Sequence, residues 1–101
     1  MQADPLASKT KRGAAGELIV CADLAAKGYD VFRAVNPDSK HDLVICKHDR
    51  CFTVQVKSVW APKYDPDKTL QYIIKKARCT CDILAVVVDG DIHYHSESIK
   101  L

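Results

Sequence analysis

An acid, an amide and an amine are predicted to meet at one end of a β-hairpin that spans residues 41–58. If residues 47–50 form its turn, Asp42 on the first strand lies opposite Gln55 on the second. Side chains alternate between the two faces of a strand, so Lys57 shares the face of Gln55. Directly opposed residues have Cβ atoms roughly 5 Å apart, which brings the three polar groups together. A register slip of one residue would separate them.

This trio suits the hydrolysis of a phosphodiester bond with the help of a divalent cation. The Asp42 carboxylate and the Gln55 side-chain oxygen are hard ligands of the kind that Mg²⁺ prefers, and the Val56 carbonyl would add a third. Lys57 would orient a water or hydroxide, or stabilise charge on the phosphate. A cation would polarise the phosphate and lower the pKa of the attacking water. The alternative is a solvent-facing hairpin in which Asp42 and Lys57 form an ion pair.

A fourth candidate, Glu17, lies on a helix expected to run from Ser8 or Thr10 to Lys27, where Gly28 ends it. On a helical wheel one broad face is apolar and carries Ala14, Leu18, Val20, Cys21, Ala22, Leu24 and Ala25. Glu17 lies inside this apolar arc, where a carboxylate is costly unless it is paired or liganded. Two explanations stay open: an ion pair at the edge of the helix, or a place in the site.

The remaining pattern predicts one α/β domain with a mixed sheet flanked by helices. Its further elements are a strand at 29–35, a turn at 36–39, the hairpin, a helix at 67–78, a strand at 83–88, a turn at 89–90 and a strand at 92–95. The second helix is indicated by an apolar stripe of Leu70, Ile73, Ile74 and Ala77. The strand at 83–88 is apolar throughout, as expected when both faces are covered. Residues 1–7 are predicted to form a loose tail.

Composition limits the size of the protein more than its function. The chain has 101 residues, of which 48% are hydrophobic, and this fits a single compact domain. The net charge is only +2, which alone does not indicate nucleic-acid binding. Basic residues do fall in or near the segments described above: Lys9, Lys11, Arg12, Arg33, Lys40, Lys57 and Lys63. Such a stripe attracts phosphate even at low net charge, although scattered solvated lysines explain it equally well.

Cysteine usage favours a reduced, intracellular protein. The chain has five cysteines, an odd number, and no signal peptide or membrane-length apolar run. A cytoplasmic location without a membrane partner is therefore expected. The predicted hairpin register places Cys46 opposite Cys51. The Cys-Thr-Cys stretch at 79–81 and the His-Tyr-His stretch at 93–95 lack the usual spacing of zinc ligands, so structural zinc is disfavoured.

The segment from Gly13 to Ser58 resembles the PD-(D/E)xK nuclease superfamily. The resemblance rests on GELIVCADLAAKGYDVFRAV at 16–35, on PDSKHDLV at 37–44 and on QVKS at 55–58. It implies a restriction-endonuclease-like αβββαβ core. Members have a helix that carries an acid, a hairpin whose first strand begins with aspartate, and an E-x-K sequence on the next strand.

The resemblance also implies roles for the candidate residues. Asp42 would be the principal metal ligand, and Lys57 would assist the nucleophile. Glu17 would join through the metal or its waters. Gln55 departs from the usual acid, but Q-V-K resembles the branch of group I intron-encoded homing endonucleases and their bacterial and phage relatives, where Gln55 would support the metal. Holliday junction resolvases are similar over the first helix and generally keep an acid.

The function implied is a Mg²⁺-dependent DNA endonuclease in which Mn²⁺ can substitute. The residues expected to hold the DNA backbone are Lys9, Lys11, Arg12, Lys40, Ser58 and Lys63. The loop at 59–66, with Trp60 and Tyr64, is a candidate segment for contacting DNA or another subunit. Cutting both strands needs two active sites, so a homodimer or a dimer of dimers is expected.

A non-catalytic module is the competing interpretation. In that case a relative of the nucleases would bind nucleic acid or a protein after losing its acid, and Gln55 favours this interpretation. Retention of Asp42, Lys57 and Glu17 argues against it, because decay would not spare that polar trio selectively.

Overall fold

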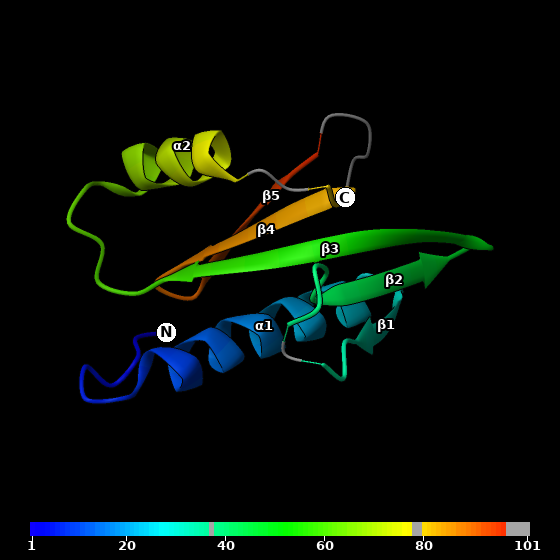
Figure 1. Cartoon of the computed structure of the whole chain (residues 1–101), viewed down its shortest axis with the longest axis horizontal. Coiled ribbons are helices and arrows are strands. Elements are labelled where there is room, and N and C mark those ends of the chain that lie inside the picture. Colours follow the sequence, from blue (N-terminus) through cyan, green and yellow to red (C-terminus); the bar gives the residue numbers. More distant parts are fainter. Residues whose placement is uncertain (37, 78–79, 97–101) are drawn as a thin grey trace.

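The chain folds into a mixed β-sheet with α1 and α2 packed on its opposite faces (Figure 1). The computed structural model describes residues 1–36, 38–77 and 80–96. Its elements are α1 (Lys9–Ala26), β1 (Asp30–Arg33), β2 (Leu43–Lys47), β3 (Arg50–Val59), α2 (Pro66–Lys76), β4 (Ile83–Val88) and β5 (Asp91–His95). The α/β class and the order of the elements confirm the prediction.

Strand β4 lies between the two helices and packs against both. The strand order is β1-β2-β3-β4-β5, and β3 and β4 run parallel, so the chain passes through α2 between them. Every residue of β4 is buried. Alternate residues belong to two clusters: Ile83, Ala85 and Val87 pack with α1, whereas Leu84, Val86 and Val88 pack with α2. This confirms the prediction of a strand covered on both faces.

Helix α1 packs on the sheet through a narrow seam. Gly16, Val20 and Leu24, spaced four residues apart, are its buried residues. A Cβ atom at Gly16 would lie 2.9 Å from the Cβ of Ser58 on β3, so the helix and strand cross where only glycine fits. The prediction that Leu18 lies on the buried face was wrong, because its side chain is 52% exposed, and Ala14, Ala22 and Ala25 of the same predicted face are exposed as well. The close crossing turns the Gly16 side of the helix toward the sheet instead.

The β2–β3 hairpin has the predicted register. Lys47 pairs with Arg50, and Val44 pairs with Thr53. His48 and Asp49 have φ angles of 52° and 63°, as a two-residue hairpin turn requires. One face of the hairpin is buried in the core through Leu43, Ile45 and Val54. The paired register stops at Leu43 and Val54, so Asp42 lies just before β2, and its predicted position opposite Gln55 falls outside the paired residues.

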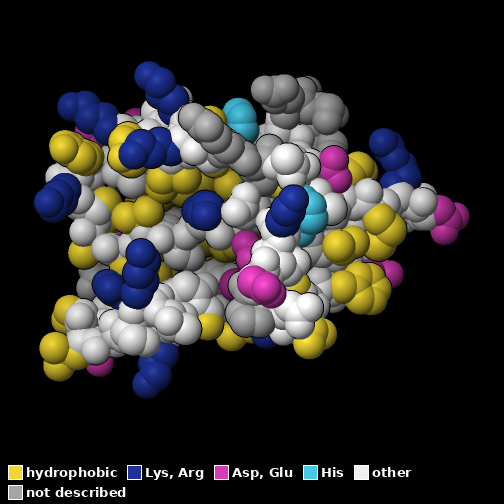
Figure 2. Space-filling view, viewed as in Figure 1, with side chains coloured by type: hydrophobic (Ala, Val, Ile, Leu, Met, Phe, Trp, Pro, Cys, Tyr) yellow, Lys and Arg dark blue, Asp and Glu magenta, His cyan; other side chains and the backbone are white. Residues whose placement is uncertain are grey.

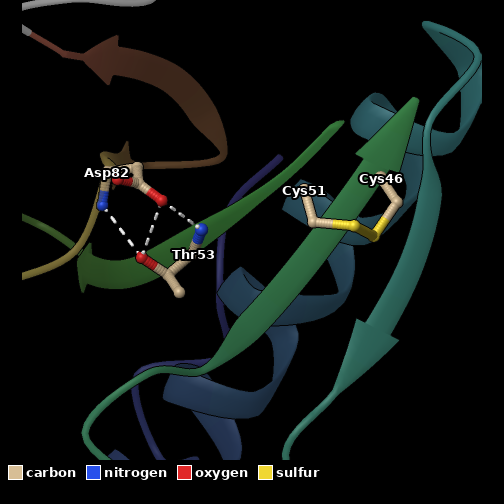
Figure 3. The surroundings of a disulfide bond; sticks show 4 residues. All are labelled: Cys46, Cys51, Thr53 and Asp82. Atoms are coloured by element: carbon tan, nitrogen blue, oxygen red, sulfur yellow. Dashed lines mark hydrogen bonds between the residues drawn. A yellow bond between two sulfur atoms is a disulfide. The ribbon is translucent and has the colours of Figure 1, made fainter. Parts of the chain in front are cut away.

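A disulfide bond joins Cys46 to Cys51 across the hairpin (Figure 3). Their Cα atoms lie 4.1 Å apart because the two residues are directly opposed in the register. Cys81 is also disulfide-bonded, and Cys21 has a free thiol. The expectation of a fully reduced protein was therefore wrong. The predicted register, which places Cys46 opposite Cys51, was the sequence feature that could have predicted this bond. The odd number of cysteines argued against disulfides and led to the wrong expectation.

Asp82 ties the start of β4 to the middle of β3 (Figure 3). Its carboxylate accepts hydrogen bonds from the backbone N–H of Thr53 at 2.8 Å and from the Thr53 hydroxyl at 3.2 Å. In return, the Asp82 N–H donates to the Thr53 hydroxyl at 2.9 Å. These bonds lie directly before the first β3–β4 pair, Val54 with Ile83, and help to set the alignment of the parallel strands.

Both helices begin at side-chain caps. The Ser8 hydroxyl accepts a hydrogen bond from the Lys11 N–H at 3.2 Å, which confirms one of the two predicted starts. The Asp65 carboxylate accepts from the Lys68 N–H at 2.9 Å, and Pro66 occupies the first turn of α2, where its missing N–H costs nothing.

The remaining boundaries differ little from the sequence prediction. Strand β1 is shorter than the expected 29–35. Both residues of the turn at 89–90 have positive φ, as predicted for a tight hairpin. Residues 1–7, expected to form a loose tail, contain a backbone hydrogen-bonded turn. Arg78, the expected end of α2, and Pro37 in the expected turn lie outside the described residues. Within the described ranges, neither helix has the length and apolarity needed to cross a membrane.

Candidate active site

One edge of β3 is left open where β2 begins. The pairing of β2 with β3 begins at Leu43 and Val54, while β3 continues to Val59 beside β4. The Asp42 N–H donates to the Val54 carbonyl at 3.1 Å, and the Val56 N–H donates to the Asp42 carboxylate at 2.7 Å. The N–H and C=O of a strand residue point toward the same side, so the Val56 carbonyl also faces this edge. The predicted acid and carbonyl therefore converge.

A cavity of about 490 Å³ lies between α1 and this open edge. Among the residues predicted for the site or for DNA binding, it is lined by Lys9, Arg12, Glu17, Asp42, Val56, Lys57 and Ser58. Gly13 and Trp60 complete its wall together with Val59. Two carboxylates, a backbone carbonyl and a lysine are thus brought together by elements that are separate in sequence.

Gln55 is not brought into this cavity. It lines a second cavity of about 370 Å³ between β3 and α2, which also includes Tyr72 and Lys76. Lys57 lines both cavities. The alternation of β3 directs Gln55 to the α2 face, whereas Asp42 at the strand end turns its carboxylate toward the Val56 N–H.

The Glu17 carboxylate is paired as well as facing the cavity. The Arg33 Nε on β1 lies 3.0 Å from Glu17 Oε1, and the arginine side chain is half-exposed. The ion pair considered from sequence is therefore real, and the same carboxylate lines the cavity. The described part of the chain contains no such pair between Asp42 and Lys57; its other ion pair joins Lys27 to Asp23.

Cys21 lies one helical turn beyond Glu17. Burial raises the pKa of its thiol, and the nearby charge of Arg33 opposes this shift only in part. Cys21 is not among the residues that line the cavity, so it does not extend the donor set.

Arg12 presents an unsatisfied donor at the cavity. Its Nε is buried and has no hydrogen-bond partner. The Trp60 indole N–H donates to the Arg12 backbone carbonyl at 3.1 Å, which links the residue after β3 to α1. A buried guanidinium donor without a partner suits an anionic ligand. Lys11 and Lys40 are exposed and do not line these cavities.

The donor set of the cavity fits Mg²⁺. Glu17 and Asp42 supply carboxylate oxygens and Val56 supplies a carbonyl, and Mg²⁺ commonly binds one or two carboxylates while keeping several waters. Across residues 1–36, 38–77 and 80–96, no three His, Cys, Asp or Glu side chains form a metal-binding group, so water and substrate would complete the coordination. Of the disfavoured zinc stretch at 79–81, Cys79 lies outside the described residues and Cys81 is disulfide-bonded.

Three residues around the site were missed or given no role from sequence. Arg33 was noted only as a basic residue, yet the pairing of β1 with β2 brings it to Glu17. Tyr72 and Lys76 lie on α2 beside Gln55. Both residues lie outside the apolar stripe that predicts this helix. No sequence pattern distinguishes them from ordinary solvated residues.

The fold is that of a nuclease family. A family model described as PD-(D/E)XK endonuclease matches residues 7–95, and the chain belongs to this family. The chain is 34% identical over 88 residues to Protein 5.3 of Escherichia phage T7, covering 79% of this chain and 73% of that protein.

A solved structure, that of the bacterial homing endonuclease I-Ssp6803I, is similar with a TM-score of 0.67. The match covers 89% of this chain and 70% of the other at 14% identity, so it concerns the fold alone. The predicted superfamily and restriction-endonuclease-like fold are confirmed.

Proposed function

We propose that the protein is a metal-dependent DNA endonuclease that hydrolyses phosphodiester bonds in the cavity between α1 and the open edge of β3. One observation carries the proposal: the Asp42 carboxylate accepts the Val56 N–H at 2.7 Å in a cavity shared with Glu17 and Lys57. Acids, a backbone carbonyl and an amine around one opening suit the transfer of a phosphoryl group to water.

Each residue has a separate task in this proposal. Asp42, the Val56 carbonyl and Glu17 would hold Mg²⁺ or Mn²⁺. When bound, the cation would supply positive charge and make a coordinated water more acidic. Lys57 would orient the attacking water and stabilise negative charge on the phosphate.

The basic residues of the same wall would hold the substrate. Arg12 would donate to a phosphate oxygen through its guanidinium group, and Lys9 and Ser58 would contact the neighbouring backbone. The contributions of Lys11 and Lys40 would be weaker, since both lie away from the cavity wall.

Gln55 is the one proposed metal ligand that does not line the carboxylate cavity. It would support the cation only after its side chain leaves the cavity beside α2. If it does so, Gln55→Glu adds a negative ligand and lowers the Mg²⁺ concentration needed for cutting. Titration of Mg²⁺ against cleavage by the two proteins tests this, and identical requirements would remove Gln55 from the metal site.

The substrate is proposed to be duplex DNA, as for a homing endonuclease, or branched DNA, as for a Holliday junction resolvase. With the cavity described above as its active site, one chain would cut one strand, so cutting both strands calls for a homodimer or a dimer of dimers. Sedimentation of the protein with and without DNA would measure that assembly.

A cleavage panel tests the function itself. Supercoiled, linear and four-way-junction DNA are incubated with Mg²⁺ or Mn²⁺ and with wild type, Asp42→Ala or Lys57→Ala. We expect each alanine variant to lose roughly a hundredfold or more in rate, as removal of a charge-stabilising group usually causes. Lys75→Ala, an exposed lysine outside the cavities, is the matched control and should cut normally.

The second candidate is a nuclease-fold module that binds without cutting. It is favoured by one observation: Gln55 stands where an acid is usual and its side chain lies outside the carboxylate cavity. Tight DNA binding with no cutting of any substrate in either metal would support this candidate and exclude the enzyme.

A further inference from the structure

A third hollow, of about 660 Å³, lies where the β3–α2 loop meets α2. Its apolar wall includes Val59, Tyr64, Tyr72 and Ile73, and its rim includes Lys63 and Lys68. We call it the tyrosine groove. Lys63 and Tyr64 belong to the loop that the sequence marked as a contact segment, and the proposed catalytic cavity does not use them.

The two tyrosines present unusually accessible rings. Tyr64 is 68% exposed and Tyr72 is 58% exposed. Lys76 Nζ lies 4.9 Å from the centre of the Tyr72 ring, so a cation is held at the ring of a residue that remains largely open. Exposed aromatic rings beside lysines are the combination that binds nucleic-acid bases by stacking and their phosphates by charge.

The groove is held in place by the fold. The Thr69 hydroxyl, on a buried residue of α2, donates to the Tyr64 carbonyl at 3.3 Å. The Asp65 cap joins the same loop to the first turn of α2. The rings are therefore presented by an anchored loop and a helix rather than by a free tail.

The groove adjoins the proposed catalytic cavity through shared residues. The cavity that contains Gln55 shares Lys57 with the catalytic cavity and shares Tyr72 and Ile73 with the groove. Along β3 the groove begins at Val59, about 10 Å beyond Val56 at the usual rise of a strand. Lys and Arg side chains gather on this half of the molecule, which carries α2 and the start of α1 (Figure 2).

We propose that the tyrosine groove binds an unpaired nucleotide of the DNA substrate beside the cutting site. Its base would stack on Tyr64 or Tyr72, and its phosphates would face Lys63 and Lys68. Bases within a duplex are stacked on each other and cannot offer a face to these rings. The groove therefore selects DNA with a single-stranded tail, flap or junction next to the scissile bond. This inference rests on the proposed nuclease function.

Binding without cutting isolates the groove. Fluorescence anisotropy is measured in EDTA with a blunt duplex and with the same duplex carrying a single-stranded tail. We expect the Tyr64→Ala, Tyr72→Ala double variant to lose about tenfold or more in affinity for the tailed DNA and less than about twofold for the blunt duplex. Phe32→Ala removes another ring that is 58% exposed, on β1, and should change neither affinity.

Two further measurements exclude a general folding defect. The Tyr64→Phe, Tyr72→Phe double variant keeps both rings and should retain the preference for tailed DNA. In wild type, 5-iododeoxyuridine placed in the tail should crosslink to Tyr64 or Tyr72 on irradiation, as read by mass spectrometry. Crosslinks found only at other residues would overturn the proposal even if the alanine variant does not fold.

Other outcomes are equally decisive. If the alanine variant loses equal affinity for tailed and blunt DNA, the groove contacts only the DNA backbone and the proposal is overturned. If it loses affinity for neither, the groove does not bind DNA and a protein partner is the alternative occupant. Wild type that cuts DNA but shows no preference for the tail overturns this inference alone. If the wild-type protein cuts no DNA substrate, the proposed function is overturned. The preference for tailed DNA is then decided by the anisotropy measurements alone.

Discussion

At the scale of single residues, Asp42 has two tasks that different substitutions can separate. Its carboxylate accepts the Val56 N–H at 2.7 Å and also faces the cavity. Asparagine keeps an acceptor for that N–H but carries no charge, whereas alanine removes both. The structural and electrostatic contributions of this side chain are therefore independently measurable.

We predict that Asp42→Asn folds with nearly unchanged stability. It should need at least about tenfold more Mg²⁺ than wild type to reach the same metal-induced rise in melting temperature. Asp42→Ala should in addition lose about 1–3 kcal/mol of unfolding free energy, because the part-buried Val56 N–H is left without a partner. Thermal melts with and without Mg²⁺ measure both effects. An asparagine variant with unchanged metal response would exclude Asp42 as a ligand.

Arg33 competes with any cation for Glu17. Its Nε lies 3.0 Å from the carboxylate, on a half-exposed side chain. We predict that Arg33→Gln lowers the Mg²⁺ concentration at half-binding by about two- to fivefold, since partly exposed ion pairs contribute up to about 1 kcal/mol. The comparison is Glu17→Gln, which should raise it. Calorimetric titration gives both values; weaker binding by Arg33→Gln would show that the arginine positions Glu17 rather than competing.

At the scale of elements, the crossing of α1 over β3 decides whether Glu17 can reach the open edge. The crossing is close because Gly16 has no side chain, and a Cβ there would lie 2.9 Å from the Ser58 Cβ. The helix cannot move away without separating Glu17 from the strand that carries Val56 and Lys57. Packing and site geometry therefore depend on the same contact.

We predict that Gly16→Ala lowers the free energy of unfolding by about 1–3 kcal/mol, because the added methyl group overpacks the crossing. Gly13 is the matched control on the same helix, since a Cβ there would meet nothing within 4 Å. Gly13→Ala should stabilise the protein by up to about 1 kcal/mol through helix propensity. Urea denaturation measures the pair; equal effects of the two substitutions would contradict the close crossing.

At the scale of the whole molecule, α1 is joined to the far edge of the sheet by a polar cluster. The Tyr94 hydroxyl on β5 donates to Asp23 at 2.5 Å, and Lys27 lies 2.7 Å from the same carboxylate. Hydrogen bonds from Lys27 and Tyr94 lower the pKa of Asp23, while burial and the Asp23 charge raise the pKa of the Tyr94 hydroxyl. The cluster connects β5 to α1, the helix that carries Glu17.

The sign of the pH effect follows from the lowered pKa. Asp23 stabilises the fold above its ordinary pKa of 3.8, and this contribution is lost as the pH falls through the lower folded value. We predict that Tyr94→Phe shifts the midpoint of acid unfolding to higher pH, because one of the bonds that lowers the pKa is removed. Tyr72→Phe, on an exposed tyrosine, should leave the midpoint unchanged. Circular dichroism against pH measures both midpoints, and coincident curves would contradict the role of Tyr94.

Local patterns were enough to predict the hairpin and the sites of most elements. Alternating apolar residues and the turn at 47–50 determined the register that pairs Leu43 with Val54 and Lys47 with Arg50. The apolar run of β4 and the caps of the helices acted locally in the same way. Each of these features depends on neighbours within a few residues, so a sequence records it directly.

The site needed more than the register. The hairpin register does not bring Gln55 and Asp42 into one cavity. The Gln55 side chain lies on the α2 face of the sheet, whereas the Asp42 carboxylate turns toward the Val56 N–H. The Glu17–Arg33 pair depends on how α1 lies over β1, and the buried face of α1 depends on a contact at Gly16 rather than on the widest apolar arc.

The sequence by itself determined the order of the elements, the hairpin register and the identity of Asp42, Lys57 and Glu17 as candidates. Only the tertiary structure decided which of them share a cavity, and that a groove bearing Tyr64 and Tyr72 adjoins it. The physical reason is range. Strand alternation and helix caps act between near neighbours, whereas cavities form between surfaces of elements that meet only after packing.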